Sequence, residues 1–152
     1  MADPQNTDDL RAMLDQRACE ALITRYTHLV DFGPGVEVAD LFTDDGVWSS
    51  GQETYEGRDA IAKFFGRERG HTKSRHVSSN TAVTPTGADT ADGLSYFTLY
   101  RYTEEKPRVP DLDDQPVILG EYRDSFVRTS EGWRIVRRDA EVGFVRRSAL
   151  KG

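Results

Sequence analysis

Apolar residues near the start of the chain repeat with the spacing of an α-helix. In residues 8–35, "DDLRAMLDQRACEALITRYTHLVDFGPG", they form one stripe at intervals of three and four: Cys19, Leu22, Ile23, Tyr26 and Val30. The final "FGPG" predicts the end of this helix, because proline lacks a backbone donor and glycine adopts helix-terminating conformations. Residues 1–7 are polar, and we expect them to be disordered.

Shorter signals follow the first helix. "VEVADLF", residues 36–42, predicts a second short helix, and "DDGVWSSG", residues 44–51, predicts a turn and a short strand. "YEGRDAIAKFFGRERG", residues 55–70, predicts a loop and then a helix that carries Ile61, Phe64 and Phe65 and stops at glycine.

In the second half of the chain the apolar period changes to two, which is typical of strands. Four strands are predicted, over residues 74–86, 91–105, 116–130 and 132–144, with a proline-rich acidic hairpin connection in "TEEKPRVPDLDDQP", residues 103–116. Helices followed by a four-stranded antiparallel meander predict an α+β fold. We expect the sheet to curl around the helices into a cone-shaped α+β barrel, with a cavity on its inner face.

The composition fits a single domain over residues 1–152, with 37% hydrophobic and 30% charged residues. A formal net charge of −6 argues against nucleic acid or an anionic membrane as a partner. The chain has neither a signal-peptide pattern nor an apolar run near the roughly 18 residues of a membrane span. We therefore expect a cytoplasmic protein.

Cysteine and histidine usage is sparse. The single cysteine, Cys19, excludes an intrachain disulfide, and on the apolar helix stripe we expect it to be a buried, inert thiol. His71 and His76 have no further histidine, cysteine or carboxylate beside them at metal-ligand spacing. We therefore expect no metal site.

The strand that contains "TKSRHVSSN", residues 72–80, is polar on one face. Because side chains alternate in a strand, His76, Ser78 and Asn80 share that face, which either meets water or lines a pocket. The basic residues around it, Arg67, Arg69, His71, Lys73 and Arg75, form either a solvated loop or an attractor for an anionic substrate.

Five motifs in order resemble the SnoaL-like branch of the nuclear transport factor 2-like superfamily. They are "RYTHLVDFG", "LFTDDGVW", "YEGRDAIAKFF", "SRHVSSN" and "GEYRDSFVRTSEGWRIVRR", and the resemblance runs from about Asp15 to Arg138. It implies the cone-shaped fold. Within the superfamily the chain looks most similar to scytalone dehydratase, bile-acid 7α-dehydratase and hexachlorocyclohexane dehydrochlorinase, which catalyse eliminations without a cofactor.

The same resemblance implies roles for particular residues. Asp31 and His76 would form a dyad, Tyr26 would hold a substrate oxygen or a water, and Asn80 would line the cavity. Arg138 matches a pocket arginine, although strand parity does not choose it over Arg137. The ketosteroid isomerase branch fits less well, because Ser50 stands where that branch carries its carboxylate base; Asp124 matches its second aspartate.

Most of these residues also have a structural interpretation. Tyr26 is either a hydroxyl donor or a core tyrosine, and Asp31 is either a partner of His76 or a cap for the following turn. Asp124 and Arg138 form either a structural ion pair or part of the site. Trp48, Tyr96, Tyr100 and Tyr102 indicate an aromatic pocket wall, although the face that carries the three tyrosines could equally form an oligomer surface. Tyr122 shares a strand face with Asp124, and both are predicted to contact the substrate.

The combined prediction is a cofactor-independent lyase. Neutral histidine, with an ordinary pKa of about 6.5, suits His76 as the base that removes a proton. Asp31 would orient its ring, Tyr26 would donate a hydrogen bond, and Arg138 would assist the leaving group. We expect a small, largely apolar, aromatic or polycyclic substrate and a homodimer or homotrimer. The alternatives are an isomerase, a cyclase, an epoxide hydrolase, or a non-catalytic ligand carrier or oxygenase small subunit.

Overall fold

A computed structural model describes residues 4–51, 53–103, 109 and 117–146 of the 152-residue chain. The helical elements are α1 (Pro4–Phe32), the 3₁₀ helix η1 (Gly35–Leu41) and α2 (Arg58–Phe65). The strands are β1 (Phe42–Ser50), β2 (Glu53–Glu56), β3 (Lys73–Pro85), β4 (Thr90–Tyr102), β5 (Val117–Thr129) and β6 (Gly132–Val145). The predicted connection over residues 103–116 lies almost entirely outside the described residues.

Helix α1 starts earlier than its apolar stripe predicts and ends where the sequence indicates. It begins at Pro4, so residues 4–7 are helical and not disordered as expected. Proline is compatible with a first turn, because the N–H it lacks would be unpaired there anyway. At the other end Gly33 takes a φ of 70°, and its N–H donates to the carbonyl of Leu29 at 2.8 Å. This left-handed glycine ends the helix immediately after Asp31 and Phe32.

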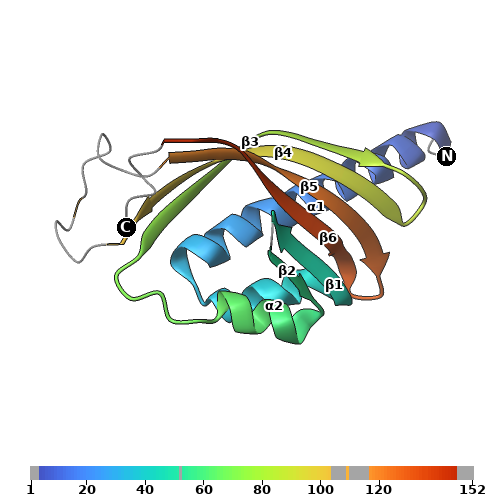
Figure 1. The fold of residues 1–152 in the computed structure, drawn as a ribbon. Helices are drawn as coiled ribbons and strands as arrows, with labels where there is room; N and C mark the ends of the chain where they lie inside the picture. Colours follow the sequence, from blue (N-terminus) through green and yellow to red (C-terminus); the bar gives the residue numbers. More distant parts are fainter. Residues whose placement is uncertain (1–3, 52, 104–108, 110–116, 147–152) are drawn as a thin grey trace.

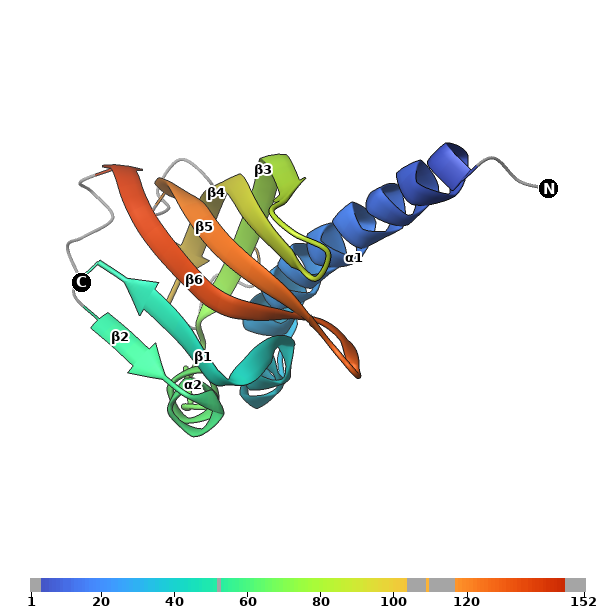
Figure 2. The same ribbon diagram turned by 90° about the vertical axis from the view of Figure 1, so that its right-hand side faces the viewer.

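The architecture is an α+β cone: helices lie against the concave face of a curved, open sheet of six strands in the order β2-β1-β6-β5-β4-β3 (Figures 1 and 2). The predicted meander is present as β3 to β6, which pair antiparallel in sequence order. The complete sheet is mixed, because β1 pairs parallel with β6, and β2 extends that edge beyond the meander. A pairing between segments so distant in sequence leaves no local signal in either strand.

The core lies between α1, α2 and the inner face of the sheet. Ile23 and Tyr26 of α1, Ile61 and Phe65 of α2, and Phe126 of β5 are all buried there. Figures 1 and 2 show that the N-terminal part of α1 extends beyond the sheet. Leu10, Met13 and Leu14 of this part are exposed. In the described part of the chain, no helix has both the length and the apolar character that crossing a bilayer requires.

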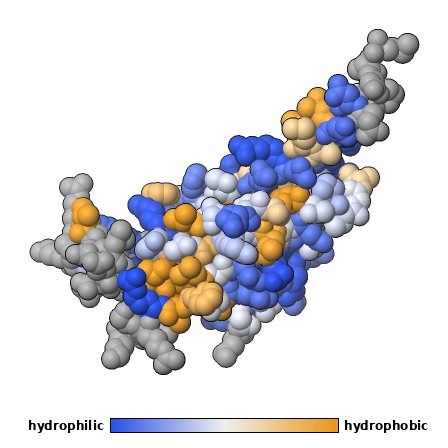
Figure 3. Space-filling model, turned by 90° about the horizontal axis from the view of Figure 1, so that it is seen from above, coloured by the Kyte–Doolittle hydropathy of each residue, from blue (hydrophilic) through white to orange (hydrophobic). Residues whose placement is uncertain are grey.

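The outer face of the sheet carries a row of directly paired residues that includes exposed apolar side chains. Val77, Thr98, Leu119 and Phe144 follow one another across β3, β4, β5 and β6. Leu119 and Phe144 are 42% and 72% exposed. Seen from this side, hydrophobic residues gather in a patch toward one end of the molecule, among more hydrophilic residues (Figure 3). Such a surface is typical of a protein contact.

Candidate active site

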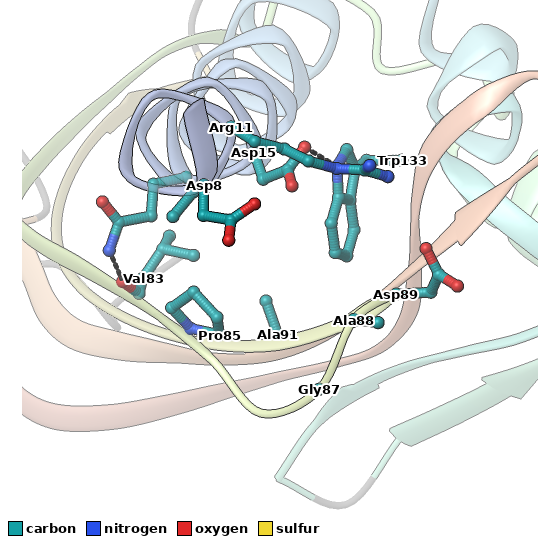
Figure 4. Close-up of a pocket in the computed structure, with 12 residues that line it drawn as sticks. Asp8, Arg11, Asp15, Val83, Pro85, Gly87, Ala88, Asp89, Ala91 and Trp133 are labelled. Atoms are coloured by element: carbon teal, nitrogen blue, oxygen red, sulfur yellow. Dashed lines mark hydrogen bonds between the residues drawn. The ribbon is translucent and has the colours of Figure 1, made fainter. Parts of the chain in front are cut away.

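Two cavities of similar size lie at different ends of α1. The first, of about 370 Å³, lies between the N-terminal half of α1 and the strands (Figure 4). Asp15 points into it, but its carboxylate already accepts hydrogen bonds from Arg128 and from the indole N–H of Trp133. The bond from Arg128 is the main cause that lowers the pKa of Asp15. This arrangement fixes the helix to the β5–β6 hairpin, and none of the predicted site residues lines it.

The second cavity, of about 390 Å³, contains four of the predicted residues. Tyr26, Trp48, His76 and Tyr122 all line it, and they come from α1, β1, β3 and β5. Its remaining apolar wall consists of Val30, Phe64, Phe65, Phe97, Leu99, Ile118, Ala140 and Val142. A largely apolar cavity with a few convergent polar groups is the usual form of a small-molecule site.

Asp31 and His76 are in direct contact. Oδ1 of Asp31 lies 2.6 Å from Nδ1 of His76, and Oδ2 accepts the backbone N–H of His76, also at 2.6 Å. The Ser74 hydroxyl donates to Oδ1 at 2.9 Å. The side chains of His76 and Asp31 are only 6% and 4% exposed. The geometry thus places Asp31 at the histidine and not in the role of a turn cap.

Asp31 stays ionised in spite of its burial. Desolvation by itself would raise its pKa, but the hydrogen bonds from the ring and backbone of His76 and from Ser74 outweigh it and lower the pKa. Asp31 lies outside the cavity, whereas His76 lines it. Since Asp31 occupies Nδ1, the ring nitrogen available to the cavity is Nε2.

Tyr26 of α1 is held by a hydrogen bond from Trp48 of β1. The indole N–H of Trp48 donates to the hydroxyl oxygen of Tyr26 at 2.9 Å, and Tyr26 is 2% exposed. Because the bond from Trp48 occupies an oxygen lone pair, the hydroxyl hydrogen of Tyr26 is left for another acceptor. Burial raises the pKa of Tyr26 to about 12, so the hydroxyl is protonated at ordinary pH.

Arg138 lies behind this cavity, between two of its tyrosines. Its guanidinium carbon is 4.2 Å from the ring centre of Tyr26 and 4.4 Å from that of Tyr122. Its Nε and Nη2 each donate to Asp124 at 2.7 Å, and both side chains are fully buried. The sheet register selects Arg138 over Arg137, because Arg138 pairs directly with Asp124 and Arg137 points outward.

Besides Asp31, four residues predicted for the site do not line the cavity. Asn80 is exposed, and the register of β3 against β4 shifts between Ser79 and Ala82, where Asn80 has a φ of 50°. This bulge breaks the alternation that would have placed Asn80 beside His76. Tyr96 is 48% exposed on the outer face, whereas its neighbour Phe97 points inward. Arg138 and Asp124 also do not line the cavity, since Tyr26 and Tyr122 stand between.

Several cavity residues were not predicted. Phe97 and Leu99 alternate with the more conspicuous tyrosines of β4, and the burial of Ala91 and Ser95 shows which set faces inward. From the sequence, Arg67 and Arg69 belong either to a solvated loop or to an attractor for an anion, and no pattern singles out Arg101. All three arginines line the cavity.

Two further expectations from the sequence concern the thiol of Cys19 and a metal site. Cys19 is fully buried, and burial raises the pKa of its thiol to about 12, in agreement with an inert side chain. Among the described residues, no group of three or more histidine, cysteine, aspartate or glutamate side chains is arranged to hold a metal ion.

Comparison of the chain with known proteins identifies the type of domain that contains this cavity. A family model described as "SnoaL-like domain" matches residues 11–139. An NTF2-like protein with a cystatin-like fold from Novosphingobium aromaticivorans is 27% identical, with a TM-score of 0.75 and coverage of 93% of this chain and 91% of that one. No curated protein matches the chain significantly in sequence.

Two further solved structures share the fold. A candidate scytalone dehydratase from Novosphingobium aromaticivorans is 24% identical, with a TM-score of 0.75 over 93% of this chain and 90% of that one. A hexachlorocyclohexane dehydrochlorinase, LinA type 2, is 17% identical, with a TM-score of 0.78 over 91% of each chain.

Proposed function

The chain belongs to the SnoaL-like domain family, and from its cavity we propose that it is a cofactor-independent lyase acting on a small, largely apolar, cyclic substrate. The observation that carries this proposal is the 2.6 Å contact between Asp31 and Nδ1 of His76, with the histidine ring at the wall of an apolar cavity. Fold alone would not support it, because one fold hosts many activities.

His76 is the general base in this proposal. Asp31 is an acceptor only, so Nδ1 of a neutral His76 carries the proton and donates it to Asp31. Nε2 then presents a lone pair to the cavity. A substrate C–H placed within reach of Nε2 loses its proton there, and the electron pair of that bond forms the new double bond.

Asp31 supports the step through charge. As His76 takes up a proton it becomes an imidazolium, and the ionised carboxylate beside it stabilises that cation without accepting the proton. Because both side chains are nearly inaccessible to water, the attraction is screened less than it would be at the surface.

Tyr26 supplies the hydrogen-bond donor. With Trp48 bonded to its oxygen, the Tyr26 O–H can point to a substrate oxygen that gains charge. That oxygen is either a carbonyl next to the reacting carbon or a departing hydroxyl. A hydroxyl leaves as water by taking the proton that His76 removed from the C–H bond, which regenerates the neutral base, whereas a halide leaves as the anion and His76 passes its proton to solvent.

Arg138 is a positioning residue in this proposal and not a donor to the leaving group. It does not line the cavity, and its guanidinium packs on the rings of Tyr26 and Tyr122 while Asp124 balances its charge. The arrangement fixes both tyrosine rings. Arg138 therefore affects catalysis indirectly, by holding the ring of Tyr26 in place.

A non-catalytic ligand carrier is the main alternative from another class. In a carrier we would expect Asp31 to cap its own turn, away from the histidine. The contact of both carboxylate oxygens with His76 favours the enzyme. An isomerase, cyclase or epoxide hydrolase would use the same proton transfer, and the choice among them depends on the substrate.

A substrate screen with two variants tests the proposal. The wild-type protein is assayed against cyclic alcohols, β-hydroxy ketones and halides, with product formation followed by the absorbance of the new double bond. We expect activity that persists in the presence of a chelator and that falls by about 10³-fold or more in His76→Gln and Asp31→Asn. Turnover that survives in His76→Gln would exclude His76 as the base.

A further inference from the structure

We propose that the substrate carries an anionic group, a carboxylate or a phosphate, which Arg67, Arg69 and Arg101 bind at the mouth of the cavity. This inference rests on the function proposed above and narrows its substrate class. It starts from the distribution of polar and apolar residues along the cavity wall.

The cavity has an apolar base and a charged mouth. Tyr26, Trp48, Phe97 and Leu99 are each at most 6% exposed and form the deep wall. Arg67, Glu68 and Arg101 are exposed residues of the same wall, and Arg69 is half-buried between the two zones. A ligand that fills this space has its apolar body near His76 and its polar end among the arginines.

The charge of the mouth is opposite to that of the chain. Among the described residues, three arginines line the cavity against one carboxylate, Glu68, whereas the whole chain has a net charge of −6. Within the described residues, no salt bridge joins Arg67, Arg69 or Arg101 to a carboxylate. Eight other arginines and histidines of the described chain have such partners. The mouth therefore presents positive charge that a ligand can neutralise.

Two of the arginines are held in place by their surroundings. The guanidinium of Arg67 stacks over the ring of Phe64 at 3.9 Å, which leaves the N–H edge of the group free to bind. Arg69 donates from Nη1 to the Val30 carbonyl at 3.2 Å and from Nη2 to the Phe65 carbonyl at 3.5 Å. A guanidinium fixed in this way loses less side-chain entropy when it binds an anion.

Repulsion among the positive charges of Arg67, Arg69 and Arg101 also favours the binding of an anion. Burial is the main cause that lowers the pKa of Arg69, and the nearby charges of Arg67 and Arg101 lower it further. Three like charges around one cavity disfavour the empty state, and a carboxylate or phosphate among them removes the repulsion. Paired N–H···O bonds from guanidinium groups suit the geometry of both anions.

The experiment compares three probes that share one apolar body. We would measure the binding of 2-naphthoate, 2-naphthamide and 2-naphthyl phosphate to the wild-type protein by calorimetry. We expect at least one of the two anions to bind about tenfold or more tightly than the neutral amide. The preference should fall as salt is added, since the mouth is open to solvent. The relative affinity of the two anions assigns the group to carboxylate or phosphate.

Substitutions of the arginines test whether the preference for an anion arises at the mouth of the cavity. In the double variant Arg67→Gln/Arg101→Gln the preference for the anion should fall to within about twofold, whereas Arg123→Gln, which removes an exposed arginine outside the cavity, should leave it unchanged. Equal affinity of the amide and both anions for the wild-type protein would overturn the inference. A preference that persists in the double variant would do the same.

A third variant separates this inference from the proposed function. His76→Gln should retain the preference for the anion, because His76 contacts the other end of the ligand. If anions are preferred while His76→Gln keeps its turnover, the lyase mechanism fails and the anion site stands. If His76→Gln is inactive and the amide binds as well as the anions, the mechanism stands and the anion site fails.

Discussion

Both carboxylate oxygens of Asp31 contact His76, one through the ring and one through the backbone N–H, each at 2.6 Å. The two residues are 45 positions apart, on the last turn of α1 and on β3. The same carboxylate therefore orients the imidazole and joins the helix to the strand. A carboxylate at the C-terminal end of a helix is disfavoured by the helix dipole, so these hydrogen bonds also stabilise its charge.

Asp31→Asn should reduce stability in a pH-dependent way. The folded pKa of Asp31 is lowered from its ordinary value of 3.8, so its carboxylate stabilises the fold above that value. At neutral pH we expect the free energy of unfolding to fall by about 1–3 kcal/mol in the variant. As the pH decreases through 3.8 and then through the lowered pKa, the difference from wild type should shrink.

Urea denaturation at several pH values measures this difference. Asp44→Asn is the matched control, because the Asp44 side chain is 95% exposed, and it should change little across the range. A difference for Asp31→Asn that grows as the pH falls would contradict the assigned hydrogen bonds.

Tyr26→Phe should lower turnover by about 10²–10³-fold, because it removes the donor to the substrate oxygen. The free energy of unfolding should also fall by about 1–3 kcal/mol, because the Trp48 N–H loses its buried acceptor. Since the pKa of Tyr26 is about 12, the shape of the pH–rate profile below that value should be the same in the variant. Tyr96→Phe serves as control at an exposed position, and turnover within twofold of wild type in Tyr26→Phe would remove Tyr26 from the mechanism.

Asp124→Asn should be one of the most destabilising polar substitutions in the protein. It leaves the fully buried Arg138 guanidinium without its counter-charge, which costs about 3–5 kcal/mol of unfolding free energy. Arg137→Met, which removes the adjacent, exposed arginine, should cost less than about 1 kcal/mol. The double variant Asp124→Leu/Arg138→Met should recover most of the loss in thermal denaturation. If Asp124→Asn is as stable as Arg137→Met, the pair carries little of the fold's stability.

The outer face of the sheet is the expected surface for a homodimer or homotrimer. Leu119→Glu places a charge in the paired row with Phe144 and should convert the assembly to monomers in sedimentation experiments. Leu10→Glu is the comparison, because Leu10 lies on the separate exposed stripe of α1. Dissociation by Leu10→Glu alone would move the interface to the helix, and a monomeric wild type would contradict self-association.

The sequence was sufficient to predict the position of a side chain where a pattern of a few residues determines that position. The glycine and proline after Phe32 predicted the end of α1, and this end is what allows Asp31 to turn toward β3. Strand alternation grouped His76 with Ser78 on one face, and the structure shows that His76 lines the cavity. Both rules act over a few residues, so the contact between Asp31 and His76 could be anticipated with the help of the family resemblance.

The sequence was insufficient to predict the position of a side chain where the pairing between distant strands determines which way it points. The bulge after Ser79 moved Asn80 away from the cavity, and one added residue is enough to reverse a strand's faces. The aromatic ring of Tyr96 favours this residue as part of a pocket wall, but its neighbour Phe97 is the one that faces the cavity. Only the register of β6 against β5 distinguishes Arg138 from Arg137.

The tautomer of His76 tests the central claim most directly. Nitrogen-15 chemical shifts of its ring, measured by NMR at alkaline pH, report which nitrogen carries the proton. The account predicts that Nδ1 is protonated and Nε2 is not in the wild-type protein, and that Asp31→Asn weakens or reverses this preference. A wild-type His76 with its proton on Nε2 would leave no base facing the cavity and would contradict the mechanism.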